Sequence, residues 1–220
     1  YMYASKAVYQ GKVLYKDFFF LQPPVHPYFY GLFQLVFPGL LMGRLTSIIC
    51  GIITTLLLMK LSRRLTGQNG AGTTFLLFMT MTSFQLYFFS ITRLYALSAM
   101  FIAAGCYFLL DSKSQSLARD CLSMLFFALA LGTRLTVLPV FFYAVIYLLV
   151  NNRGVKNRLA PILLGFASIG VLYLPFIITA GTERLWFNLL GMNLSLHSNN
   201  LAASLVQKVR ATSKLLQNYL

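Results

Sequence analysis

The chain has 220 residues, of which 58% are hydrophobic and only 10% are charged, whereas a soluble domain carries about 25% charged residues. This composition excludes an ordinary soluble domain and predicts an integral membrane protein of the helical kind. The formal net charge of +14 does not predict nucleic-acid binding, because Lys and Arg fall mostly in short gaps between apolar runs. There they indicate membrane topology and contact with lipid phosphate, so membrane lipid is an expected partner and nucleic acid is not.

The first 45 residues are polar, rich in aromatic residues and stiffened by proline. Residues 1–10 have a helical composition, and Gly11 is a plausible end to that helix. The next stretch, GKVLYKDFFFLQPPVHPYFYGLFQLVFPGLLMGRL, predicts a loop on the membrane surface. Within it, Val25 to Phe37 is apolar but has only 13 residues, and a crossing needs about 20. We therefore expect a surface helix with aromatic rings at headgroup depth, namely Tyr28, Phe29, Tyr30 and Phe33.

A competing topology stays open at the level of composition. If Val25 to Phe37 crossed the membrane, Lys6, Lys12 and Lys16 would be cytoplasmic, which the positive-inside rule also accepts. The length of this run and the Pro38-Gly39 break after it argue against a crossing.

Downstream, apolar runs of membrane length alternate with short gaps. The longest run, Cys121 to Val150, is interrupted by Gly132-Thr133-Arg134 and by Pro139. Residues 181–200 form a predicted amphipathic surface segment that contains Trp186 and Phe187. The other predicted crossings are Leu45 to Leu61, Thr73 to Ser90, Leu94 to Leu110 and Leu159 to Ala180.

Basic residues predict the orientation of these runs. Three gaps hold three, two and three Lys or Arg, and they alternate with gaps that hold one each. The positive-inside rule places the three rich gaps in the cytoplasm. Both flanks of Cys121 to Val150 are then cytoplasmic, so this run must cross an even number of times. It is predicted to form two short helices, or a re-entrant hairpin, that turn near Gly132 to Arg134 at the outer surface.

This topology places Arg44, Arg93 and Arg134 at the outer ends of three different helices. An arginine near the bilayer is costly unless it reaches the interface or finds a partner. Two interpretations stay open: three unrelated side chains that reach the interface, or a cationic cluster that binds a lipid phosphate through the guanidinium fork.

Several of these stretches together resemble a known family. They are GKVLYKDFFFLQPPVHPYFYGLF, the GRL that opens a membrane helix, ALALGTRLTVLPV with Arg134, YLPF at 173–176, and WFNLLGMNLSLHS. The pattern resembles the polyprenyl-phosphate-sugar-dependent glycosyltransferases of the GT-C fold. It is most similar to the protein-mannosyltransferase-like enzymes of glycosyltransferase family 39 and to the related lipid A aminoarabinose transferases.

The chain departs from that family at its acidic residues. Family members carry an acidic pair in the first outer loop, and by register this pair would lie upstream of Tyr1. Many members also have an acidic residue at the start of the helix near Arg93, where this chain reads TRLYALS. The chain is therefore expected to be a fragment that is truncated at both ends, with its main acidic pair outside it.

The resemblance implies an all-α, polytopic transmembrane helical bundle of the GT-C kind, with an outer-face loop and juxtamembrane helices. It divides one transmembrane domain into an outer loop (1–44), membrane helices (45–180) and a second outer-loop segment (181–220). The implied activity moves a sugar from a lipid-linked donor, a dolichyl or undecaprenyl phosphate, to a protein, lipid or glycan acceptor. The site would face the extracytoplasmic side of the cell membrane. No nucleotide-binding or metal motif occurs in the chain, so no cofactor and no metal are expected.

Such a transfer needs a carboxylate that deprotonates or orients the acceptor hydroxyl, and cations that stabilise the departing phosphate. Asp17 is the candidate carboxylate, although a loop aspartate also bonds nearby backbone amides. The substrate-binding candidates are Arg44, Arg93, Arg134, His26, Tyr15 and Tyr95. The histidine equally suits a helix cap, and the tyrosines, with Tyr28, equally suit interfacial anchors. Glu183 and His197 are further candidates for substrate contact, whereas Asp111 and Asp120 are expected to be solvated.

Two other classes of protein compete with a transferase. A transporter or flippase for a lipid-linked or anionic substrate would show paired broken helices and ionisable groups near mid-membrane. In this sequence the charges cluster at helix ends. A membrane scaffold without catalysis would explain the apolar runs, but not the outer arginines or the loop from Asp17 to His26. The sequence therefore favours the glycosyltransferase.

Overall fold

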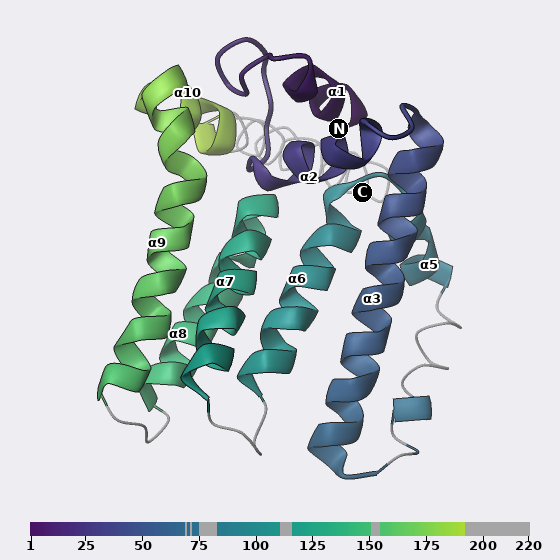
Figure 1. The fold of residues 1–220 in the computed structure, drawn as a ribbon, viewed down its shortest axis with the longest axis vertical. Helices are drawn as coiled ribbons and strands as arrows, with labels where there is room; N and C mark the ends of the chain where they lie inside the picture. The colour runs from purple at the N-terminus through teal and green to yellow at the C-terminus, as the bar shows by residue number, and fades with distance from the viewer. Residues whose placement is uncertain (69, 71, 75–82, 111–115, 151–154, 192–220) are drawn as a thin grey trace, which may run out of the picture.

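The computed structural model describes residues 1–68, 70, 72–74, 83–110, 116–150 and 155–191. These residues form helices that run between two ends of an elongated molecule, with shorter helices lying across one end (Figure 1). The described residues form no β-sheet, and their only strand-like pairing is one isolated bridge between Leu14 and Phe18. The all-α fold class predicted from the sequence is confirmed.

The long helices form a bundle in which successive elements run in opposite directions (Figure 1). Within the described ranges, two helices are long and apolar enough to cross a membrane, Leu40–Thr66 and Leu159–Ala180. Their exposed faces carry large apolar side chains, as lipid contact requires. The bundle consists of α3 (Leu40–Thr66), α5 (Ser83–Ser90), α6 (Leu94–Leu109), α7 (Leu117–Thr133), α8 (Leu138–Val150) and α9 (Val155–Ala180).

The predicted break between Gly132 and Arg134 is confirmed. Helix α7 ends at Thr133, and Arg134 has an extended backbone with φ −154° and ψ 121°. A short 3₁₀ turn over Leu135–Val137 then leads into α8, whose second residue is Pro139. Proline fits the first turn of a helix because that turn needs no partner for its backbone N–H.

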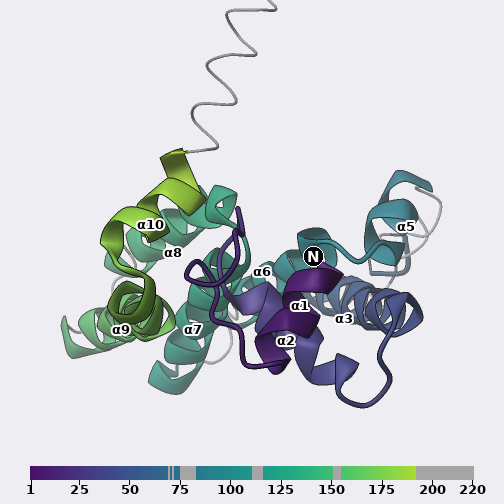
Figure 2. The ribbon, with the colours of Figure 1, turned by 90° about the horizontal axis from the view of Figure 1, so that it is seen from above.

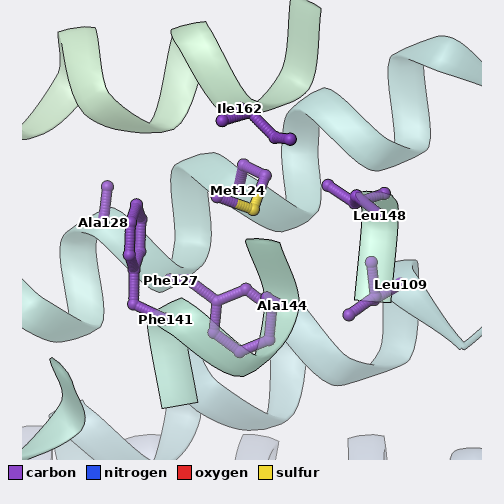
Figure 3. Packing of buried hydrophobic residues seen from close by; sticks show 8 residues of the cluster. All are labelled: Leu109, Met124, Phe127, Ala128, Phe141, Ala144, Leu148 and Ile162. Carbon is purple, nitrogen blue, oxygen red and sulfur yellow. The ribbon is translucent and has the colours of Figure 1, made fainter. Parts of the chain in front are cut away.

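A buried apolar cluster joins the four helices α6 to α9 (Figure 3). Phe127 of α7 and Phe141 of α8 are each 1% exposed and lie in this cluster with Met124. Ser123 also faces inward, and its hydroxyl donates to the Gly105 carbonyl at 2.9 Å. The cluster holds α6 and α7 in place against α8 and α9.

We call the short elements at one end of the bundle the cap. It consists of α1 (Met2–Tyr9), α2 (Val25–Gln34), α10 (Thr182–Trp186) and the π-helical turn Phe187–Gly191 (Figures 1 and 2). Helix α2 has 10 residues and therefore spans about 15 Å, which is too short for a crossing. The competing topology in which Val25 to Phe37 crosses the membrane is therefore wrong.

Helices α1 and α2 pack against each other at a glycine. A Cβ at Gly31 would collide with the ring of Tyr9 and come within 2.8 Å of the Ser5 carbonyl oxygen. Gly11 follows the end of α1, as the sequence predicts, and has φ +85°, a conformation that glycine adopts without strain. The two helices therefore form one unit that rests on the bundle.

Two expectations about burial are wrong. Tyr30 is fully buried between α2 and α3 and is therefore not exposed to lipid headgroups: its hydroxyl and that of Ser47 on α3 are 2.8 Å apart. Asp120 is not solvated but 3% exposed, because it lies in the first turn of α7, where the helix packs on its neighbours. A helix N-terminus also favours a negative charge.

Other sequence predictions fall partly or wholly outside the described residues. Of the predicted crossing Thr73 to Ser90, the structure describes residues 73–74 and 83–90. The predictions for Asp111 and His197 lie outside the description. The same holds for Lys113 and Arg153, and for the side chains of Lys156 and Arg158, which are basic residues of the gaps predicted to be cytoplasmic.

Candidate active site

The three predicted arginines lie where helices meet the cap. Arg44 is in the second turn of α3, Arg93 is the N-cap residue of α6, and Arg134 is the C-cap residue of α7. These three helix ends lie at the cap end of the bundle (Figure 1). The structure therefore brings together residues that are separated by 49 and 41 positions in the sequence.

Arg44 and Arg93 line one pocket of about 370 Å³, which we call the arginine pocket. None of the described residues that line it is acidic, and both arginines are exposed. Thr92 also lines it, and its buried hydroxyl has no hydrogen-bond partner among the described residues. An unpaired donor beside two guanidiniums makes the pocket suited to an anion. Its lining is Tyr1, Met2, Tyr3, Leu40, Arg44, Ile91, Thr92 and Arg93.

Arg134 is half-buried and lies outside this lining, but Tyr1 connects it to the pocket. Its guanidinium carbon lies 4.9 Å from the ring centroid of Tyr95, which is cation–π geometry. Burial raises the pKa of the Tyr1 hydroxyl, while the guanidiniums of Arg93 and Arg134 act in the opposite direction. The Tyr1 ring therefore lies in the electrostatic field of both arginines.

A second pocket, of about 410 Å³, lies between the loop after α1 and the segment around α10. We call it the mixed-charge pocket, because two acidic and two basic residues line it: Asp17, Glu183, Lys16 and Arg184. The rest of its lining is Tyr15, Phe18, Phe19, Phe187 and Asn188. The structure thus brings Asp17 and Glu183 together across 166 positions of sequence.

Asp17 also performs a local structural task. Its Oδ2 accepts a hydrogen bond of 2.7 Å from the backbone N–H of Val13, and its own N–H donates to the Val13 carbonyl at 2.9 Å. The carboxylate therefore bonds a nearby backbone amide, which is the alternative role that a loop aspartate can have. Its side chain is nevertheless exposed and lines the mixed-charge pocket.

One aromatic pair links the linings of the two pockets. Tyr3 of the arginine pocket meets Phe18 of the mixed-charge pocket edge to face, with ring centroids 6.2 Å apart. Tyr1 meets Phe20 in the same way at 6.1 Å, and Phe20 follows the lining residue Phe19 in the chain. We call the rings of Tyr1, Tyr3, Phe18 and Phe20 the aromatic wall.

Tyr15 and His26, two substrate-binding candidates, are both buried. Tyr15 is 3% exposed, and its hydroxyl donates to the Gln22 carbonyl at 2.6 Å, so it holds the loop in place. His26 lines neither described pocket and stacks on Tyr30 with ring centroids 4.2 Å apart. Burial lowers the pKa of His26 to about 3, so the ring is neutral at physiological pH. Among the described residues, neither ring nitrogen finds a hydrogen-bond partner.

Sequence reasoning missed Tyr1, Tyr3, Thr92 and Asn188. Asn188 is 5% exposed, and its Oδ1 accepts from the backbone N–H of Phe20 at 3.2 Å, so it joins the α10 segment to the loop. The polar residue in an otherwise apolar stretch, FNLLG, was the one signal that could have found it. Within the described part of the chain, no three His, Cys, Asp or Glu side chains come together as metal ligands would.

The fold and these pockets define a helical membrane protein with a cationic pocket at one end of its bundle. The family model for dolichyl-phosphate-mannose-protein mannosyltransferases matches residues 21–178, and the chain belongs to this family. It is therefore a membrane protein of the glycosyltransferase class, of the mannosyltransferase type. No curated protein and no solved structure matches the chain.

Proposed function

We propose that this chain is part of a multi-pass enzyme of the cell membrane that transfers a sugar from a polyprenyl phosphate. The acceptor would be met on the extracytoplasmic face, which we assign to the cap. The description of the family model that matches residues 21–178 names a sugar carried on a lipid phosphate. The arginine pocket supplies two guanidiniums that could bind such a phosphate. The observation that carries the proposal is that Arg44 and Arg93 line one pocket, with no acidic residue among the described lining.

The reaction explains why arginines belong there. The acceptor oxygen forms a bond to the anomeric carbon, and the bond from that carbon to the phosphate oxygen breaks. The lipid phosphate leaves with the electron pair, and the acceptor proton passes to a carboxylate. Negative charge grows on the phosphate as the bond breaks, so guanidiniums that bond to it lower the barrier and do not merely tighten binding.

Arg134 would complete the phosphate site from the side. Its guanidinium is held over Tyr95 and lies close enough to Tyr1 to influence the hydroxyl that Arg93 also influences. A guanidinium fixed on an aromatic ring loses less freedom when it binds an anion. Asp17 remains the candidate for the acceptor carboxylate.

An apolar pocket of about 510 Å³ lies under the start of α2. Phe29 of α2, Phe101 of α6 and Val171 of α9 are among its lining residues, and no charged residue is among the described lining. Such a surface suits the hydrocarbon chain of a prenyl lipid. In this proposal the membrane helices and α2 hold the lipid chain, while Asp17 and the rest of the mixed-charge pocket meet the acceptor.

The test uses the protein in membranes and measures the release of polyprenyl phosphate from polyprenyl-phosphate-mannose. Loss of one charge-assisted contact to the leaving phosphate should cost about 2–4 kcal/mol, or roughly a hundredfold in rate. We expect this loss for Arg44→Ala, Arg93→Ala and Arg134→Ala, with unchanged amounts of folded protein.

The matched control is Arg63→Ala. Arg63 is an exposed arginine on the same helix as Arg44, and 19 residues of α-helix place it about 28 Å further along the axis. We expect its rate to stay near the parental value. A parental rate with Arg44, Arg93 and Arg134 all replaced would show that the phosphate site is wrong.

A further inference from the structure

The mixed-charge pocket has a different electrostatic character from the rest of the molecule. The chain carries a formal net charge of +14 and only four acidic residues, yet two of these, Asp17 and Glu183, line this pocket. Lys16 and Arg184 line it as well, so its formal charges balance. A pocket without net charge inside a cationic protein favours a neutral ligand over an anion, which the arginine pocket would attract more strongly.

We propose that the mixed-charge pocket binds a neutral, hydroxyl-rich ring, the carbohydrate part of the acceptor. That the bound sugar is the acceptor rests on the proposed transfer, whereas the binding itself does not. The lining offers both kinds of polar partner that a sugar hydroxyl needs: the carboxylates accept hydrogen bonds, while Lys16 and Arg184 donate them.

The aromatic residues of the pocket supply the apolar part of the recognition. Phe19 is 52% exposed and Phe187 is 53% exposed, so both rings are accessible to a ligand in the pocket. The C–H face of a pyranose ring is apolar and can cover such a ring while its hydroxyls stay with the charged groups. Ligand sites commonly combine aromatic walls with a few polar groups in this way.

The walls of the pocket are fixed before a ligand arrives. The buried amide of Asn188 accepts from the Phe20 N–H at 3.2 Å and donates to the Arg184 carbonyl at 2.7 Å. Tyr15 has φ +66°, a strained value for a residue other than glycine, and its hydroxyl bond to Gln22 holds that turn. Strain of this kind persists only where the surroundings enforce it, and here it sets the direction of the chain at Lys16 and Asp17.

The position of the pocket also fits an acceptor. It lies at the cap, as the arginine pocket does, and the edge-to-face contact of Tyr3 with Phe18 joins the two linings. A sugar in the mixed-charge pocket would therefore lie at the same end of the bundle as the site proposed for the lipid phosphate. A donor and an acceptor must meet at one end of the molecule for transfer.

The chain contains a single tryptophan, Trp186, and it reports on this pocket directly. It is 63% exposed and lies in α10 between the lining residues Arg184 and Phe187. Its fluorescence can be followed in the purified protein while neutral methyl hexosides, beginning with methyl α-mannoside, are added without any donor. We expect a saturable change, and glycerol at the same concentration should leave the fluorescence unchanged.

Three variants locate the binding. Asp17→Asn, Glu183→Gln and Phe187→Ala should each weaken the hexoside by about tenfold, as expected for one hydrogen bond to a charged group or one stacking contact. All three side chains are exposed, and an unchanged thermal unfolding midpoint would confirm that the variants fold. Arg44→Ala, in the arginine pocket, should bind the hexoside as the parental chain does.

Three outcomes would overturn the inference: no saturable response to any hexoside, an equal response in all variants, or the same variant-dependent response to a serine-rich peptide in place of the sugar. The last would assign the pocket to a polypeptide. These outcomes do not depend on catalysis. Arginine-dependent release of polyprenyl phosphate would still support the proposed function if hexoside binding failed, and parental release without the three arginines would refute that function alone.

Discussion

The two pockets at the cap are similar in volume, about 370 and 410 Å³, but are built in different ways. The arginine pocket takes its charged residues from helix α3 and the turn before α6, whose positions the bundle fixes. The mixed-charge pocket takes its residues from a loop and from the short α10 segment, which one hydrogen bond between Phe20 and Asn188 joins. In a strongly basic chain the placement of the few acidic residues therefore distinguishes the two pockets more clearly than the arginines do.

The largest expected effect involves both pockets, because Tyr3 of α1 and Tyr1, the N-cap residue of α1, belong to the aromatic wall. Gly31→Leu would force a side chain into the Tyr9 ring and toward the Ser5 backbone, which cannot yield as a flexible side chain does. We expect destabilisation of about 3 kcal/mol, measured by thermal unfolding, together with loss of hexoside binding and of polyprenyl phosphate release. Gly170→Leu is the control, since a Cβ there meets nothing within 4 Å. An unchanged unfolding midpoint would contradict the packing of α1 on α2.

A smaller effect should separate the pockets. Asn188→Leu would leave the Phe20 N–H without its acceptor, at a cost of about 2 kcal/mol. We expect weaker hexoside binding, read from Trp186 fluorescence, while phosphate release in a donor-only assay stays near the parental rate. Asn188→Gln keeps both an oxygen acceptor and an N–H donor and should bind the hexoside more tightly than Asn188→Leu does. If Asn188→Leu impaired donor hydrolysis as strongly as hexoside binding, the pockets would not be separable.

The smallest effect should appear on the arginine side alone. Tyr95→Leu removes the ring under Arg134, and a cation–π contact at a partly exposed site contributes about 1 kcal/mol. Release of polyprenyl phosphate should fall by roughly fivefold. Tyr95→Phe keeps the ring and should release at close to the parental rate. Equal losses in both variants would assign the effect to the hydroxyl instead of to the ring.

Features that depend on residues close together in the sequence were predictable from the sequence. The break at Gly132 to Arg134 follows from local helix rules, and the length of Val25 to Phe37 excludes a crossing. The clustering of the three arginines at one end follows from alternating helix directions, which basic gaps reveal.

Features that depend on tertiary contacts were not predictable. Which face of α2 packs on the bundle, and hence that Tyr30 is buried, depends on the helices that α2 contacts. The aromatic residues of α2 occur on more than one face, so its composition does not indicate the buried one. The burial of Asp120 depends on its neighbours in the same way. The bond between Phe20 and Asn188 spans 168 positions, and no period or motif in one sequence indicates a pair so distant.

Unequal helix length has a consequence for the lipid around the molecule. Helix α3 has 27 residues, or about 40 Å, whereas α8 has 13, or about 20 Å, and exposes Phe142, Tyr143 and Ile146 on its surface. In the membrane placement proposed above, the described residues of α8 are shorter than a hydrocarbon layer of about 30 Å, so we expect the bilayer to thin beside this helix. The short 3₁₀ turn before α8 follows directly after Arg134. Headgroups in a thinned layer would sit deeper than in the surrounding membrane, so we expect a lipid phosphate that diffuses along this side to reach the level of Arg134 without leaving its leaflet.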